Sequence, residues 1–225
     1  SRWAFEAVAV GTYCYNEYER PFFEVDRTRS AAFFFRESYI PELQSQLERM
    51  EFLRREGREG ADDCLLTIKN SLPRLEEATG LVYEGDFSYS SLETYFKEMD
   101  IALVLISNQL TLEKDRELTE LIKEKGKDEM VALKKANCNI RLEEFVTGSA
   151  AKSAVEVVKN HIVPRAGYIF LTPVSRNGRA PFYSSEKIVG SLHIPTLFFN
   201  LTVMLIMCIL LTAVLLANIP DKMKK

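Results

Sequence analysis

The sequence predicts a mainly α-helical protein, in which a helical domain with a small β-hairpin is followed by one C-terminal transmembrane helix. Apolar residues recur at helical spacing through most of residues 21–190, and the stretch after Pro164 carries hairpin signals. Residues 197–217 contain 21 uncharged, mostly apolar residues in succession. With 47% hydrophobic and 27% charged residues, the chain is neither wholly disordered nor a disulfide-dense mini-protein.

Residues 1–20 are predicted to form a helix at a membrane surface. Nearly half of the aromatic residues lie in the first forty positions, and Tyr and Trp favour the bilayer–water interface. Ala4, Ala7, Val8 and Gly11 share one helical face, whose small side chains would let another membrane helix approach closely. An amphipathic helix packed on a soluble core fits the same pattern, so the residues alone leave both interpretations open.

Residues 21–190 are predicted to form a mostly helical domain. One helix covers Ile40 to Met50, a second covers about 61–78 with an interruption at Pro73, and a third opens at the capping-box pattern Ser90-x-x-Glu93. The third helix would bury one apolar face, which consists of Phe96, Met99, Leu103 and Ile106.

The second half of this domain is predicted to change from helix to strand. A charged helix covers 112–135 with a break at Gly126, and a final helix runs from Arg141 or Lys152 to His161. Beyond Pro164, the apolar run 168–171 indicates a strand and Asn177-Gly178 indicates a tight turn.

The uncharged segment 197–217 predicts a transmembrane helix over residues 195–219. As a helix it would be about 31 Å long, which matches the hydrocarbon thickness of a bilayer. Pro195 suits the start of such a helix and Pro220 its end. Buried helices of soluble proteins rarely contain apolar runs of this length.

The charges around this span predict its orientation. The tail, residues 220–225, contains three lysines and one aspartate, whereas residues 188–196 carry no formal charge. The positive-inside rule therefore places the tail in the cytoplasm and residues 20–190 outside it. No signal segment precedes the domain in this sequence, so we expect the chain to be the C-terminal piece of a longer, multi-pass protein of the cytoplasmic membrane.

Both ends of the sequence resemble one membrane-protein family. Residues 1–7, Ser-Arg-Trp-Ala-Phe-Glu-Ala, resemble the segment that follows the fifth transmembrane helix in White-like, G-subfamily (ABC-2 type) ABC transporters. Residues 187–191, Lys-Ile-Val-Gly-Ser, and 194–200, Ile-Pro-Thr-Leu-Phe-Phe-Asn, resemble the entry to the sixth span of bacterial relatives. The roughly 170 residues between these ends resemble the large outer insertions of Bacteroidetes-type homologues.

This resemblance implies a permease half that is fused behind an ATP-binding domain and works as a homodimer or heterodimer in the lipid bilayer. ATP and Mg would serve the full-length transporter, and no cofactor is expected in this chain. The partners implied are the upstream permease helices and the ATP-binding domain of the same polypeptide. A net charge of −3 argues against a nucleic-acid partner.

The resemblance also suggests residues for a gate or a helix contact, namely Arg2, Trp3, Phe5 and Glu6. An unpaired carboxylate near hydrocarbon is costly, so Glu6 should pair with a base such as Arg2 or lie at a wet outer gate. Some family members carry outer-loop disulfides. If one forms here, Cys64 with Cys138 is favoured, because both lie on predicted helices of one domain, although three reduced cysteines fit equally well.

Catalytic and metal-binding patterns are missing from the sequence. His161 and His193 have no neighbouring ligands at metal spacing, and Gly148 to Ser153 lacks the glycines of a phosphate-binding loop. The sequence therefore predicts no catalytic residue and no metal site, which disfavours a membrane-bound enzyme. A transporter permease fragment remains the first hypothesis, and a membrane-anchored helical binding or adaptor module is the alternative.

Overall fold

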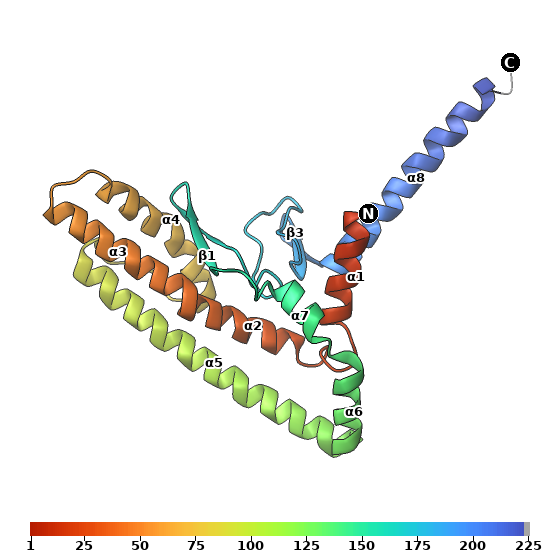
Figure 1. Ribbon diagram of the computed structural model, residues 1–225, viewed down its shortest axis with the longest axis horizontal. Coiled ribbons are helices and arrows are strands. Elements are labelled where there is room, and N and C mark those ends of the chain that lie inside the picture. The colour runs from red at the N-terminus through yellow and green to blue at the C-terminus, as the bar shows by residue number, and fades with distance from the viewer. Residues whose placement is uncertain (223–225) are drawn as a thin grey trace.

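The computed structural model describes the backbone of residues 1–222 and the side chains of residues 1–216, and it is mostly helical. In Figure 1, α2 to α5 form an elongated bundle, the two hairpins lie on one side of it, and α8 projects away from the body beside α1. The helices are α1 (Arg2–Cys14), α2 (Phe23–Phe34), the π-helical η1 (Phe35–Tyr39), α3 (Ile40–Arg55), α4 (Ala61–Thr79), α5 (Tyr89–Lys125), α6 (Lys127–Asn137), α7 (Ile140–Thr147) and α8 (Thr196–Lys222). The strands are β1 (Val155–Val158), β2 (His161–Pro164), β3 (Glu186–Val189) and β4 (Leu192–Pro195).

The predicted helix at Ile40 to Met50 is confirmed as part of α3, which continues without a loop from α2 through η1. Pro41 explains the π-helical turn between them. Proline has no N–H and its ring crowds the carbonyl four residues earlier, so the backbone widens there and the Ile40 N–H donates to the Phe35 carbonyl. The sequence pattern did not predict this join.

The predicted helix at 61–78 is confirmed as α4, but the interruption expected at Pro73 is wrong, because Pro73 lies inside one continuous helix. The helix at Ser90 is also confirmed, but α5 begins two residues earlier than a capping box at Ser90 requires. Ser88 is its N-cap, and the Ser88 side chain accepts a hydrogen bond from the Ser91 N–H. The separate helix expected from 112 is the second half of α5, which ends at Gly126 with a positive φ of 91°.

Two predictions for residues 141–171 are wrong. The expected helix to His161 is instead the short α7, which ends at Gly148, followed by the antiparallel hairpin β1–β2. Lys159 and Asn160 both have positive φ, as a tight two-residue hairpin turn requires, and the valines at 155, 157 and 158 favour a strand. Residues 168–170, expected as a strand, form a turn.

A second antiparallel hairpin, β3–β4, leads directly into α8, with Glu186 opposite Pro195 and Lys187 opposite Ile194. Its turn at Gly190 and Ser191 lies beyond the turn that the sequence predicted at Asn177-Gly178. That earlier turn instead borders the hairpin, because the Gly178 N–H donates to the Ile188 carbonyl at 2.8 Å.

The main core lies between α2, η1, α3, α4 and α5. Its fully buried side chains include Leu43, Leu47, Ile68, Phe96 and Leu103, and Ile162 of β2 joins them. A second, smaller core joins α1 to α7 through Val10, Val146 and Ile169. The predicted apolar face of α5 is therefore confirmed as core.

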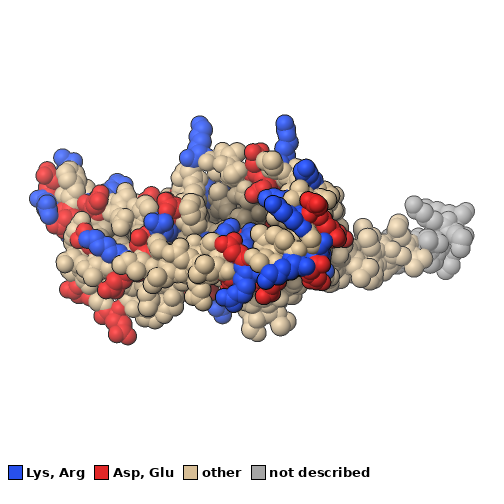
Figure 2. Space-filling view, turned by 90° about the horizontal axis from the view of Figure 1, so that it is seen from below, with Lys and Arg blue, Asp and Glu red and all other residues tan. Residues whose placement is uncertain are grey.

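Residues Thr196–Leu216 of α8 are long and apolar enough to cross a membrane, with a mean hydropathy of 2.6 over the most apolar window. Only 6% of that window is buried in the protein, so α8 is not a core helix. Figure 2 shows charged side chains over the body but none on the shaft of α8 as far as the described side chains extend. An exposed apolar helix of this length indicates membrane association. The predicted basic tail, residues 220–225, lies outside the described side chains.

Replacing Leu103 by alanine should lower the free energy of unfolding by about 2–5 kcal/mol, because it leaves a cavity in the main core. Thermal unfolding of the detergent-solubilised chain, followed by circular dichroism, measures the loss. Leu105→Ala is the matched control, since Leu105 lies on the same helix and is 63% exposed. Equal destabilisation by both variants would show that the buried face of α5 has been assigned incorrectly.

Candidate functional site

The candidate site is the junction where α1 runs antiparallel to the first turns of α8. A Cβ at Gly11 would lie 3.3 Å from a Leu197 methyl carbon, the rings of Trp3 and Phe199 lie 6.4 Å apart, and the Ser1 hydroxyl lies 3.8 Å from the Met204 sulfur. The small-residue face predicted for α1 therefore packs against α8 at Gly11, and Ala7 is buried, whereas Val8 is exposed. This contact covers roughly the first 12 Å of α8, given the helical rise per residue.

An ion pair lies buried in this junction. The Lys187 ammonium donates to both carboxylate oxygens of Glu6 at 3.1 and 3.2 Å, and the two side chains are only 4% and 3% exposed. The Asn200 amide donates to the same carboxylate at 2.9 Å and to the Trp3 carbonyl at 3.2 Å. The Lys187 ammonium also lies over the rings of Trp3 and Phe199, 5.7 and 5.9 Å from their centroids.

These contacts join three segments that are distant in the sequence, namely α1, β3 and α8. Two buried charges lose their hydration, which costs several kcal/mol per ion unless each has close partners. Here the carboxylate has three donor contacts, and the ammonium has the carboxylate and two aromatic faces. We call Glu6, Lys187 and Asn200 the junction triad.

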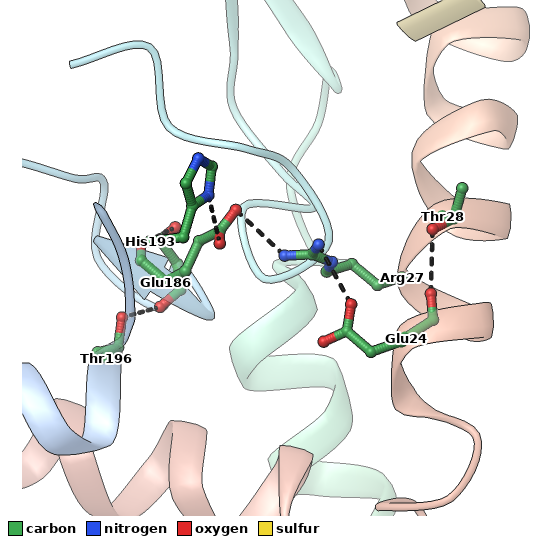
Figure 3. Close-up of polar contacts among 7 residues, drawn as sticks. Glu24, Arg27, Thr28, Glu186, His193 and Thr196 are labelled. Carbon is green, nitrogen blue, oxygen red and sulfur yellow. Dashed lines mark hydrogen bonds and ion pairs between the residues drawn. The ribbon is translucent and has the colours of Figure 1, made fainter. Parts of the chain in front are cut away.

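The neighbouring residue of β3 makes a second ion pair on the opposite side of the strand. Successive strand residues point to opposite faces, so Glu186 points away from α1. Its carboxylate lies 3.1 Å from the Arg27 guanidinium of α2 and 2.9 Å from Nδ1 of His193 on β4, as Figure 3 shows. Arg27 also pairs with Glu24 at 3.2 Å. Strand β3 therefore links the helical domain on one face to α1 and α8 on the other.

The start of α8 is fixed by the segment that precedes β3. The Thr196 N–H donates to the Ser185 carbonyl at 2.9 Å, and the Thr196 hydroxyl donates to the Ser184 carbonyl at 2.6 Å. Thr196 and Ser184 are both almost completely buried. These bonds hold the first turn of α8 against the hairpin from which it emerges.

The four residues predicted for a gate or helix contact differ in burial and in the groups that they contact. Glu6 is paired, but the expected pairing with Arg2 is wrong, since the Arg2 guanidinium stacks on the Phe182 ring at 4.9 Å. The alternative of a wet gate is also wrong in this structure, because Glu6 is buried. Trp3 covers the junction triad, whereas Phe5 is 52% exposed and stacks on Phe182 at 6.3 Å.

Lys187, Asn200 and Glu186 were not predicted as site residues. Lys187 is the last base before the uncharged segment and Asn200 is one of its few polar residues, so both carried a signal. Their unusual positions in the sequence did not indicate which residue they contact, because Lys187 lies 181 positions from Glu6.

All four cysteines are free in the structure, so the suggested Cys64–Cys138 bridge is not formed. Cys64 is buried in the main core on α4, whereas Cys138 follows α6, and Figure 1 places these helices at opposite ends of the domain. The Cys138 thiol donates to the Glu19 carboxylate at 3.3 Å. Burial, together with that carboxylate, raises the pKa of Cys138 to about 11.

Among the described residues, no group of three or more His, Cys, Asp and Glu side chains could hold a metal ion. Comparisons of the chain with protein-family models, with curated proteins and with solved structures give no match.

Breaking the Glu6–Lys187 pair should destabilise the protein strongly, because a buried charge then lacks its partner. We expect Glu6→Gln or Lys187→Met to cost about 3–5 kcal/mol each, and the double variant to cost less than either single one. Thermal unfolding in detergent measures all three. Glu17→Gln is the control, since Glu17 is exposed on the loop after α1. Additive losses in the double variant would contradict a coupled pair.

Cys138 should react slowly with iodoacetamide, because only the thiolate is nucleophilic and its raised pKa keeps the thiol protonated. At pH 8 we expect alkylation about a hundredfold slower in the folded protein than in the same chain unfolded in urea. Without reductant, the urea-unfolded chain should take up four labels by mass spectrometry. An uptake of two labels would show that a disulfide forms in the protein.

Proposed function

We propose that this chain is the C-terminal part of the permease of an ABC-2 type, White-like ABC transporter. In this proposal, residues 1–14 and α8 belong to the membrane region, and residues 20–190 form an extracytoplasmic domain. The chain contributes to export of a substrate, and ATP hydrolysis with its Mg belongs to another domain of the same polypeptide. The working transporter is a homodimer or heterodimer in the cytoplasmic membrane.

The packing of the two ends of the chain carries this proposal. The segments that resemble the family, residues 1–7 and 187–200, form the junction triad together, although almost the whole chain separates them. Two segments that flank an insertion should meet in this way if the insertion extends from a compact membrane unit. The buried ion pair also gives a physical reason for an acid and a base beside an apolar helix.

The arrangement suits a unit that transmits movement between a membrane helix and an outer domain. The first turn of α8 is bonded to the segment before β3, and β3 is held on one side by Glu6 and on the other by Arg27. A tilt of α8 would therefore displace the hairpin rather than leave it behind. In the proposed transporter, the outer domain would respond to the movement of the last span.

A membrane-anchored binding module remains the second candidate, and a specific observation favours it. The hairpins and α4 enclose a cavity of about 940 Å³, which is at the upper end of the range for ligand sites. Such a module would need the single span only as an anchor and would need no ATP-binding domain.

An antibody raised against residues 21–190 tests the proposal in the organism's own membranes. It should bind intact spheroplasts without permeabilisation, because the domain is proposed to lie outside. From solubilised membranes it should precipitate a polypeptide that is much larger than 25.8 kDa and hydrolyses ATP. Antibody bound to permeabilised cells serves as the control for total protein. A 25.8 kDa polypeptide without ATPase activity would favour the anchored binding module instead.

A further inference from the structure

The cavity of about 940 Å³ lies between α4, the two hairpins and the loop that joins them. Helix α4 contributes Asn70 to Glu77, β2 contributes His161 to Pro164, and β3–β4 contributes Ile188 to His193. The loop is tied to β3, since the Gly190 N–H donates to the Arg176 carbonyl at 2.8 Å and Asn177 pairs with Val189. The walls are therefore parts of the hydrogen-bonded fold and not free chain.

Positive charge dominates the polar lining. Arg74, Arg176 and Arg179 line the cavity, and Glu77 is the single carboxylate among the lining residues. Arg176 and Arg179 are exposed at the rim, whereas Arg74 is partly buried in the wall. The two histidines of the described chain, His161 and His193, also border the space.

Arg74 is the group that points to a ligand. Its guanidinium makes no hydrogen bond or ion pair of 4 Å or less with the described residues, although arginine carries five donors. Burial lowers the pKa of Arg74, and this effect outweighs the opposing influence of the neighbouring Glu77 carboxylate. A guanidinium that is partly withdrawn from water and makes no direct ion pair favours an anion in the cavity beside it.

Apolar side chains also line the cavity, among uncharged polar ones such as Ser71, Thr172 and Ser191. Ile162, Leu171 and Ile188 are buried at the wall, and Pro164 and Pro173 lie beside them. A small inorganic anion would fill little of this space and would leave the apolar wall in contact with water. A ligand with an anionic head and a hydrocarbon chain would satisfy Arg74 and cover the apolar wall together.

The cavity lies near the start of the apolar helix α8, where a ligand from a lipid bilayer could reach it. His193 on its wall lies three residues before Thr196, where α8 begins, and Figure 3 shows His193 and Thr196 at the same hairpin. Amphiphiles partition into bilayers, so a cavity beside the start of a membrane helix lies where they are concentrated.

We propose that this cavity binds a single-chain amphiphile with a carboxylate or phosphate head. The head pairs with Arg74, and the hydrocarbon chain lies on Ile162, Leu171 and Ile188. This site is independent of the proposed transport function, because it would exist equally in a transporter and in an anchored module.

Photo-crosslinking of the full chain in phosphatidylcholine nanodiscs tests the site. The probes are diazirine-labelled dodecanoate, dodecyl phosphate and dodecanol, and labelled peptides are mapped by mass spectrometry. We expect the two anionic probes to label peptides of α4 and residues 161–193, and the neutral alcohol to label α8 alone. The stronger of the two anionic probes identifies the head group. Equal labelling of the cavity by dodecanol would overturn the proposal.

Variants decide whether Arg74 recognises the head. Arg74→Met should reduce labelling of the cavity about tenfold or more, as expected for loss of a charge-assisted bond, while Arg74→Lys should retain most of it. Arg58→Met is the matched control, because Arg58 is an exposed arginine outside the cavity lining. Circular dichroism checks that each variant is folded. Unchanged labelling in folded Arg74→Met, or complete competition by millimolar inorganic phosphate, would overturn the proposal.

Discussion

The buried ion pair between Glu6 and Lys187 is the interaction on which the rest of the architecture depends. Each charge would be expensive to bury alone, and each is stabilised by a group from another part of the chain. Helix α1 cannot leave α8 without exposing the pair or leaving Lys187 unpartnered. The two helices and β3 therefore behave as one unit, which defines where the helical domain can lie relative to the apolar helix.

Strand β3 extends this constraint to the helical domain and to the cavity. Glu186 connects it to α2 through Arg27, while Ile188 on the same strand forms part of the cavity wall. Within four residues, the strand thus contributes to the junction triad, to the contact with α2 and to the proposed amphiphile site. The wall of the cavity and the start of α8 are consequently connected through one short hairpin.

The sequence predicted features that depend on local periodicity, and it failed where distant residues decide. Helix α4, the buried face around Leu103 and the break at Gly126 follow from residue spacing and glycine geometry, which are local. One local feature is also predicted wrongly, since the β1–β2 hairpin replaces the helix expected up to His161 although the valines from Val155 favour a strand. The need of Glu6 for a base was predictable from its apolar neighbours, but its partner was not, because nothing local connects it to Lys187.

The side chains of Glu186 and Lys187 point to opposite faces of β3, and this affects the register in which β3 pairs with β4. A strand shifted by one residue turns every side chain to the opposite face. A shift in one direction would place Glu186 against the carboxylate of Glu6 and Ser185 against Arg27, whereas a shift in the other would place Lys187 against Arg27 and Ile188 against Glu6. In either direction one contact becomes a like-charge pair and the other loses its partner. The opposite charges of two adjacent residues therefore disfavour a misaligned strand in both directions, and because β3 pairs with β4, the strand that leads into α8, the same two charges fix the residue at which the apolar helix begins.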